Sequence, residues 1–316
     1  MISRIRNWSA PDSDEKSRQS AADVAITITT QALLRLCAVL PKRLLHFLAT
    51  CASWLAWPFK TTSRKITERN IAIAFPDFPI SKQQDLAKAS FGQLFHAVAD
   101  LGPTWMSPTE RLLDRISSVV GGEHLRESIA ENRGVIVLVP HLGNWELIGF
   151  YLAARYSVTT LFKAPKLAAV HDIILRARQR NGNKLVPADK SGVHALVKAL
   201  KSRELVAILP DQVPPSGSGE FAPFFGEPAL TMTLVTRLIN RYKSKAVLAY
   251  ATRQPDNSYQ LVFRPADEGI YSSNPSSSLI ALNKSVEQCV LDCPEQYRWE
   301  YKRFKYRPDM SRRESY

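Results

Sequence analysis

Short apolar runs alternate with segments of helical periodicity along most of the chain. Five runs have the length and composition of buried strands: 135–140, 158–162, 205–210, 246–251 and 259–263. Helical spacing predicts helices over 81–105, with Ser81 as the cap, and near 145–155, 168–181, 190–202 and 231–243. This alternation is typical of an α/β fold with a mostly parallel central sheet flanked by helices.

Two apolar stretches precede this region. Residues 24–40 are interrupted by Arg35, whereas 44–59 contain 16 uncharged residues. A helix of that length spans about 24 Å, less than the roughly 30 Å of a hydrocarbon core. Lysines and arginines flank the second stretch, and Trp54 and Trp57 lie near its end, as in a helix lying in an anionic interface. A buried pair of core helices and a tilted single span are the alternatives.

Composition divides the chain into three parts. Residues 1–23 are polar and mixed in charge, which predicts a mobile extension rather than a signal peptide. Residues 24–65 form the predicted membrane-associating helical segment, and 66–316 the main domain. No internal repeat or Gly/Ser linker divides that domain.

The chain carries a net charge of +13 and has a pI near 9.7. Such a charge favours an anionic partner: nucleic acid, phospholipid headgroups or an acidic carrier protein, although solubility alone would also explain it. Four cysteines without a CxxC pair indicate reduced thiols rather than a disulfide framework: Cys37, Cys51, Cys289 and Cys293.

The candidate chemistry follows the first predicted strand of the sheet. In VLVPHLGNWELIG (137–149), His141 follows the strand and Glu146 lies in the first turn of the next helix. A carboxylate near an imidazole fixes its tautomer and stabilises its protonated form, so His141 is a candidate general base oriented by Glu146. The simpler alternative is a packed histidine and an acidic residue at a helix N-terminus.

The turn after His141 and the end of a second strand add to this candidate site. Gly143 and Asn144 suit a tight turn, and the start of the helix is expected to offer free N–H groups to an oxyanion. A second strand ends similarly, in ILPD, so Asp211 is expected to meet His141 over one crevice at the carboxyl edge of the sheet.

Other chemistries lack their motifs. The chain contains no HExxH, GxSxG, P-loop or GxGxxG, which disfavours a zinc hydrolase, serine hydrolase, ATPase or Rossmann dehydrogenase. The other histidines give no site: His46 lies in an apolar stretch, and His96 lacks an acidic partner at a strand end.

Four segments resemble one known family. HLGNWE (141–146) resembles the H-x4-D/E motif of the bacterial lipid A late acyltransferases, the lauroyl/myristoyl transferases. ERNIAIAFPD (68–77), GEFAPFFGEPALTMT (219–233) after LPDQ (209–212), and PEQYRWEYKRFKYRP (294–308) are similar to further blocks of that family. The similarity runs in order from about residue 30 to 308.

The resemblance implies a glycerolipid-acyltransferase-like fold and a secondary acylation in lipopolysaccharide biosynthesis. An acyl-carrier-protein thioester would donate its acyl group to a hydroxyl of a lipid A precursor at the cytoplasmic face of the inner membrane. His141 would act as the base without a covalent intermediate, and neither a cofactor nor a metal is implied. The substrate-binding candidates are Arg178, Arg180, Asp211 and Asn144.

One segment departs from the family pattern. After LFKAP (161–165) the family has Tyr-Arg-Pro-x-x-Asn, whereas this chain has lysines and alanines. This leaves the acyl length and the acceptor open. Acylation of another membrane glycolipid or aminolipid, with acyl-CoA as donor, is the alternative. A non-catalytic membrane or nucleic-acid binder is a third, although the position of the basic aromatic segment 297–305 within the resemblance argues against a nucleic-acid partner.

Overall fold

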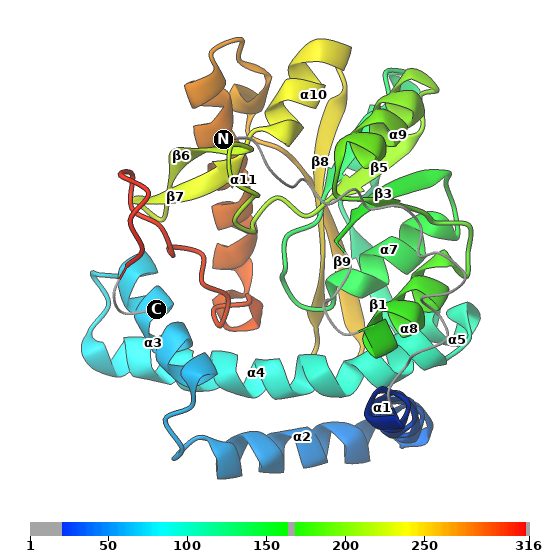
Figure 1. Ribbon diagram of the computed structural model, residues 1–316, viewed down its shortest axis with the longest axis vertical. Coiled ribbons are helices and arrows are strands. Elements are labelled where there is room, and N and C mark those ends of the chain that lie inside the picture. The colour runs from blue at the N-terminus through cyan, green and yellow to red at the C-terminus, as the bar shows by residue number, and fades with distance from the viewer. Residues whose placement is uncertain (1–20, 164–167, 314–316) are drawn as a thin grey trace.

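The computed structural model describes residues 21–163 and 168–313, and in them a seven-stranded sheet with helices on both faces (Figure 1). The strand order is β1-β9-β8-β2-β5-β3-β4, and every pairing is parallel except β8 with β9. The strands are β1 (Ile116–Val120), β2 (Val135–Leu138), β3 (Val158–Phe162), β4 (Lys184–Pro187), β5 (Leu205–Ile208), β8 (Lys245–Arg253) and β9 (Tyr259–Pro265). The predicted α/β class and mostly parallel sheet are confirmed.

The five predicted strands are all present. In the part of the chain that it describes, the structure adds four strands, two at the edges of the sheet and two in a separate hairpin. Strands β1 and β4 close the two ends of the sheet, and β6 (Gly219–Phe224) pairs with β7 (Glu227–Met232) in a separate hairpin. Edge strands are half exposed, so ISSVV and KLVP lack the apolar run that marks a central strand. The central strand β2, by contrast, is buried along its whole length.

Helices cover both faces of the sheet. The main-domain helices are α3 (Thr62–Ala74), α4 (Ile80–Met106), α5 (Thr109–Leu113), α6 (Gly122–Ala130), α7 (Trp145–Ala153), α8 (Ala168–Gln179), α9 (Lys190–Lys201), α10 (Leu234–Tyr242) and α11 (Pro275–Asp292). Successive residues of β2 supply two separate cores: Ile136 and Leu138 pack with α9, α10 and α11, while Val135 and Val137 pack with α7 and α8. A strand buried on both faces explains the uninterrupted apolar run.

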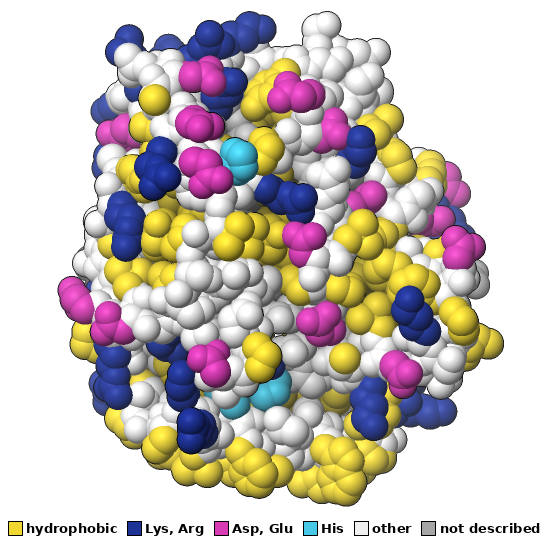
Figure 2. Space-filling view, turned by 180° about the vertical axis from the view of Figure 1, so that it is seen from behind, with side chains coloured by type: hydrophobic (Ala, Val, Ile, Leu, Met, Phe, Trp, Pro, Cys, Tyr) yellow, Lys and Arg dark blue, Asp and Glu magenta, His cyan; other side chains and the backbone are white. Residues whose placement is uncertain are grey.

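The N-terminal stretches form two helices, α1 (Ala21–Val39) and α2 (Lys42–Ala56), that pack against α4 below the sheet (Figure 1). They are not a buried pair: Val39, Phe47 and Trp54 are each more than 60% exposed. Figure 2 shows hydrophobic side chains gathered at this end of the molecule. Among the described residues, no helix combines the length and apolar character needed to cross a bilayer.

Two predictions fall outside the described residues. Most of the expected mobile extension lies in residues 1–20, and the segment that departs from the family pattern includes 164–167.

Candidate active site

The central feature of the site is a histidine held by an aspartate from the neighbouring strand. Strands β2 and β5 pair in parallel with Leu138 opposite Ile208, so the residues that follow them lie side by side. His141 Nδ1 is 2.8 Å from Asp211 Oδ1, and the His141 amide donates to Asp211 Oδ2 at 2.9 Å. The expectation that the two strand ends meet is therefore confirmed.

The surroundings of this pair determine which atom of the ring can act as a base. Burial alone would raise the pKa of the Asp211 carboxyl, but the charge and hydrogen bonds of His141 outweigh it and hold that pKa below its ordinary value. An ionised Asp211 accepts from Nδ1–H, which leaves Nε2 as the unprotonated nitrogen. The Gln212 amide nitrogen lies 3.0 Å from Nε2, where it donates. In the neutral ring, Nε2 thus carries the free lone pair.

Glu146 does not orient the imidazole, contrary to the sequence prediction. Its carboxylate accepts from two nitrogens of Arg178: Nε donates to Oε2 at 2.8 Å, and Nη2 donates to Oε1. The prediction failed because the five-residue spacing turns Glu146 into the first helical turn, toward α8, while Asp211 occupies the ring nitrogen. Burial lowers the pKa of Arg178, but the Glu146 charge outweighs this and the pKa is raised.

The other predicted substrate-binding residues are used inside the protein. Arg180 donates to two carbonyls near the end of α4, those of Ser107 at 2.5 Å and Thr104 at 3.2 Å. Asn144 caps α7 by accepting from the Leu147 amide at 3.3 Å, and its Nδ2 donates to Thr104 Oγ1. Asp211 is 3% exposed and contacts His141, so its observed contact is with the base. Substrate contacts of Arg178, Arg180 and Asn144 stay a prediction.

The backbone of the loop is fixed at Gly143, which has φ +57°. A Cβ there would lie 2.0 Å from the Ala251 carbonyl oxygen, so no larger residue fits without displacing backbone. The Gly143 amide donates to the Gln296 carbonyl and the Asn144 amide to the Ala251 carbonyl. These two amides, which precede the helix, therefore bind the loop to the sheet. Whether amides at the start of α7 serve an oxyanion stays a prediction.

The segment after α11 contacts the loop from the other side. The Arg298 amide donates to the His141 carbonyl at 3.2 Å, and Leu142 forms an isolated bridge with Tyr297. The Arg298 guanidinium lies 4.9 Å from the centre of the Trp145 ring, which itself lies 5.3 Å from the His141 ring. Sequence reasoning connected Gln212 and this segment to the site only through the family resemblance.

A second buried polar cluster was missed. His46 and His96 were set aside, yet their Nδ1 atoms are 3.0 Å apart, and His46 Nε2 is 3.4 Å from Asp100 Oδ1. Asp100 lies four positions after His96 in the sequence, but no pattern connected either residue to His46, because His46 and His96 lie 50 positions apart on different helices. Within the described residues, no group of three or more His, Cys, Asp or Glu side chains is arranged to hold a metal ion.

Comparison with known proteins agrees with this site. Residues 14–306 match the bacterial lipid A biosynthesis acyltransferases. A lipid A biosynthesis palmitoleoyltransferase of Escherichia coli (strain K12) is 28% identical over 271 residues, 85% of this chain and 87% of that protein. A lauroyltransferase of lipid A biosynthesis from the same organism is 25% identical over 272 residues, 85% and 88% of the two chains. A phosphatidylinositol mannoside acyltransferase of Mycobacterium tuberculosis (strain CDC 1551 / Oshkosh) is 26% identical over 144 residues, 44% of each chain.

The chain matches acyltransferases over most of its length and is therefore an acyltransferase, with a histidine–aspartate pair at the carboxyl edge of its α/β sheet. The chain belongs to the bacterial lipid A biosynthesis acyltransferase family.

Proposed function

We propose that this enzyme transfers an acyl group from an acyl-carrier-protein thioester to a hydroxyl of a lipid A precursor. The observation that supports this most directly is the orientation of His141: Asp211 holds Nδ1, and Nε2 faces the neutral amide of Gln212. A secondary alcohol is a poor nucleophile, so a base must accept its proton as it attacks the thioester. The family match supports the choice of acceptor.

The reaction follows from these positions. The substrate hydroxyl displaces the Gln212 amide from Nε2, and its oxygen attacks the thioester carbonyl carbon while Nε2 takes the proton. Asp211 stabilises the imidazolium that results. When the tetrahedral intermediate collapses, the C–S bond breaks and the imidazolium returns the proton to the leaving thiolate. An ester and a free thiol are produced, and no covalent enzyme intermediate is formed.

The surface properties of the chain support its partners and its location. The net charge of +13 favours an acidic carrier protein and anionic headgroups. The exposed apolar side chains of α1 and α2 suit a helix pair that lies in the membrane interface: Leu33, Leu36, Phe47, Leu48, Trp54 and Leu55. Both features fit binding at the cytoplasmic face of the inner membrane.

A second acceptor is supported by one comparison. The mycobacterial relative is named for acylation of a phosphatidylinositol mannoside, and it shares 26% identity over 144 residues. Acylation of another membrane glycolipid, with acyl-CoA as the donor, is therefore the alternative that the experiment must separate.

The test incubates purified full-length protein with acyl-carrier-protein thioesters of several lengths, or acyl-CoA, and a lipid A precursor or a mannosylated phospholipid. Mass spectrometry of the lipids identifies the product. We expect one added acyl chain on the lipid A precursor with the carrier-protein donor, and none with His141→Ala. Acylation of the mannosylated phospholipid alone would support the alternative. If the folded protein adds no acyl chain to either acceptor from any donor, the proposal is wrong.

A further inference from the structure

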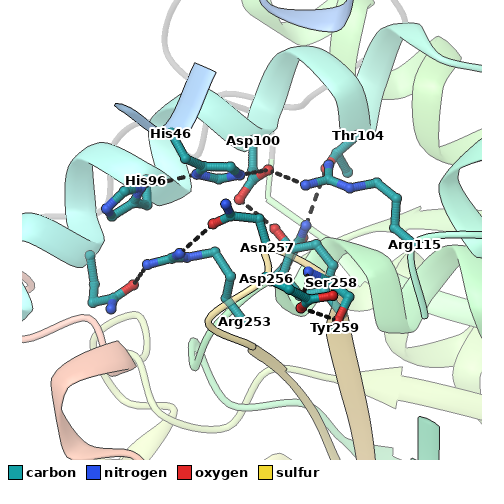
Figure 3. A network of polar contacts seen from close by, with 12 residues as sticks. His46, His96, Asp100, Thr104, Arg115, Arg253, Asp256, Asn257, Ser258 and Tyr259 are labelled. Carbon is teal, nitrogen blue, oxygen red and sulfur yellow. Dashed lines mark hydrogen bonds and ion pairs between the residues drawn. The ribbon is translucent and has the colours of Figure 1, made fainter. Parts of the chain in front are cut away.

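A buried carboxylate in α4, Asp100, contacts His46 of the exposed helix α2 (Figure 3). Asp100 also lines a cavity together with residues 143–146 of the loop that carries His141. Asp100 is 4% exposed. Its Oδ1 accepts from Arg115 Nη2 at 2.8 Å, and its Oδ2 accepts from the Tyr259 hydroxyl. Tyr259 is 1% exposed, and His46, 3% exposed, approaches the same carboxylate from α2. Three elements, α2, α4 and β9, therefore meet at one side chain, together with Arg115 from the connection between α5 and β1.

The charge at the centre of this cluster is retained. Burial alone would raise the pKa of the Asp100 carboxyl, but the His46 ring and the charge of Arg115 outweigh it and hold the pKa below its ordinary value. A buried carboxylate is tolerated only when it is paired and hydrogen bonded, so its three neighbours are held firmly in turn.

The histidines have one consistent arrangement of protons. Burial, assisted by the charge of Arg253, lowers the pKa of His96 to about 4, so His96 is neutral near pH 7. If its Nδ1–H donates to His46 Nδ1, the proton of His46 lies on Nε2 and faces Asp100. No two acceptors then face each other. The chain of contacts runs from His96 through His46 to Asp100 and Tyr259.

The far end of this series of contacts reaches a cavity lined by residues 143–146, which follow His141 in the sequence. A cavity of about 30 Å³ is lined by Asp100, Tyr259, Asn144 and Glu146 among others. Asn144 caps α7, the helix that carries Glu146, and is bound to Thr104 one turn along α4 from Asp100. The volume admits about two water-sized groups, so the cavity leaves little room for this wall to shift without moving residues 143–146 of the loop that carries His141.

At its other end, this series of contacts begins on α2, whose outer face is apolar. His46 points inward from α2, while its neighbours Phe47 and Leu48 are 63% and 47% exposed on the outer side. The one short helix thus contacts Asp100 on its inner face and presents apolar side chains on its outer face.

We propose that Asp100 is a positioning residue for acyl transfer, which fixes the cavity wall through Tyr259 and couples it to the seating of α2 through His46. The inference rests on the proposed function. It predicts that turnover depends on residues of α2 and α4 that do not touch the reacting atoms.

The experiment measures kcat and the donor KM of the full chain on anionic vesicles for Asp100→Asn, Tyr259→Phe and His46→Leu. We expect kcat to fall about tenfold for the first two variants, with the donor KM within about twofold. His46→Leu should lower kcat less than Asp100→Asn does, and His46→Gln, which keeps a donor near Asp100, should restore it. The double variant His46→Leu/Asp100→Asn should be no slower than Asp100→Asn alone, because both residues act through one contact.

Two control variants separate positioning from folding. Asp256→Asn removes an exposed carboxylate that bonds only to Ser258 and should leave kcat unchanged. Val286→Ala creates a cavity in the other core and reports what loss of stability alone does to kcat.

The outcomes are distinct. The proposal is overturned if Tyr259→Phe and Asp100→Asn keep kcat within twofold of the unmodified protein. It is also overturned if their kcat falls no further than that of Val286→Ala when the variants have equal melting temperatures. Should Asp100→Asn fail to fold, Tyr259→Phe decides alone, because it removes a single hydroxyl. Absence of transfer by the unmodified protein overturns both proposals, whereas full turnover with unaffected variants overturns only this one.

Discussion

His141 and Asp211 lie 70 positions apart in the chain, yet two hydrogen bonds join them, one from the ring and one from the backbone amide. The double contact fixes the tautomer of the ring and the position of its main chain together. An aspartate in this arrangement orients the base and stabilises its protonated form.

Replacing Asp211 by Asn should therefore lower kcat by about 100-fold or more. An amide at this position can donate to Nδ1, which moves the ring proton to Nε2 and removes the base. Steady-state acyl transfer measures the loss. Asp309→Asn, which removes an exposed carboxylate bonded to Ser311, is the matched control and should be fully active. Equal activity of the two variants would show that Asp211 does not orient the base.

Glu146→Gln should destabilise the protein, because it leaves Arg178 without its anionic partner in a largely buried site. Breaking one side of a buried pair costs on the order of 3 kcal/mol in the free energy of unfolding. Denaturant unfolding measures the change, and the double variant Glu146→Gln/Arg178→Gln should cost less than the sum of the two single variants. Strict additivity would contradict the pairing.

Gly143→Ala should impair both folding and turnover, because the new Cβ would meet the Ala251 carbonyl oxygen at 2.0 Å. Gly182 offers a matched control: its φ of +81° is also positive, and no atom lies within 4 Å of the position of its Cβ. Gly182→Ala therefore reports the conformational strain alone, about 1 kcal/mol. Melting temperatures and kcat compare the two, and equal effects would mean that the close approach to Ala251 is unimportant.

Trp54→Ala should weaken binding to anionic vesicles by about tenfold. Full burial of a large apolar side chain contributes roughly 1.5–3 kcal/mol to the free energy of transfer from water, and an indole at the interface is buried in part. Trp54 is 69% exposed on α2. Vesicle sedimentation measures the partition. Leu291→Ala removes an apolar side chain, 56% exposed, from α11 and should leave binding unchanged. A similar loss for both variants would place the membrane contact elsewhere.

The folded protein should lose stability as the pH falls from about 6.5 to about 4. Burial lowers the pKa of His96 to about 4, from an ordinary value of 6.5. Within this window the unfolded chain binds a proton at His96 that the folded protein does not, so the free energy of unfolding decreases as the pH decreases. Chemical denaturation at several pH values measures the slope. His96→Asn should flatten it, and an unchanged slope would exclude His96 as its source.

The central strands were predictable from sequence because burial on both faces leaves mostly apolar and β-branched residues in them. Strand β3 begins and ends where its apolar run VTTLF does. The edge strands β1 and β4 were not predictable, since a half-exposed strand of four or five residues has no distinctive composition. The helix α11 was missed because its buried face alternates small polar residues such as Ser278 and Ser285 with apolar ones.

The site also contains residues that could be predicted from the sequence and residues that could not. His141 and Asp211 were found because both follow strand ends, and strand pairing brings such positions together. The partner of Glu146 was not found, because the sequence does not determine whether a residue in a first helical turn faces back to the loop or sideways to the next helix. The cluster around Asp100 depends on how α2 and α4 pack, which local patterns do not encode.

The loop of His141 obtains its backbone partners from residues that follow the whole sheet in sequence. Gln296 and Arg298 bond to it after β9 has ended at Pro265. During synthesis, these two bonds can form only after every strand of the sheet has been made, so the loop that carries His141 is completed last. An enzyme that modifies lipids at a membrane would in this way remain inert while it is still emerging from the ribosome.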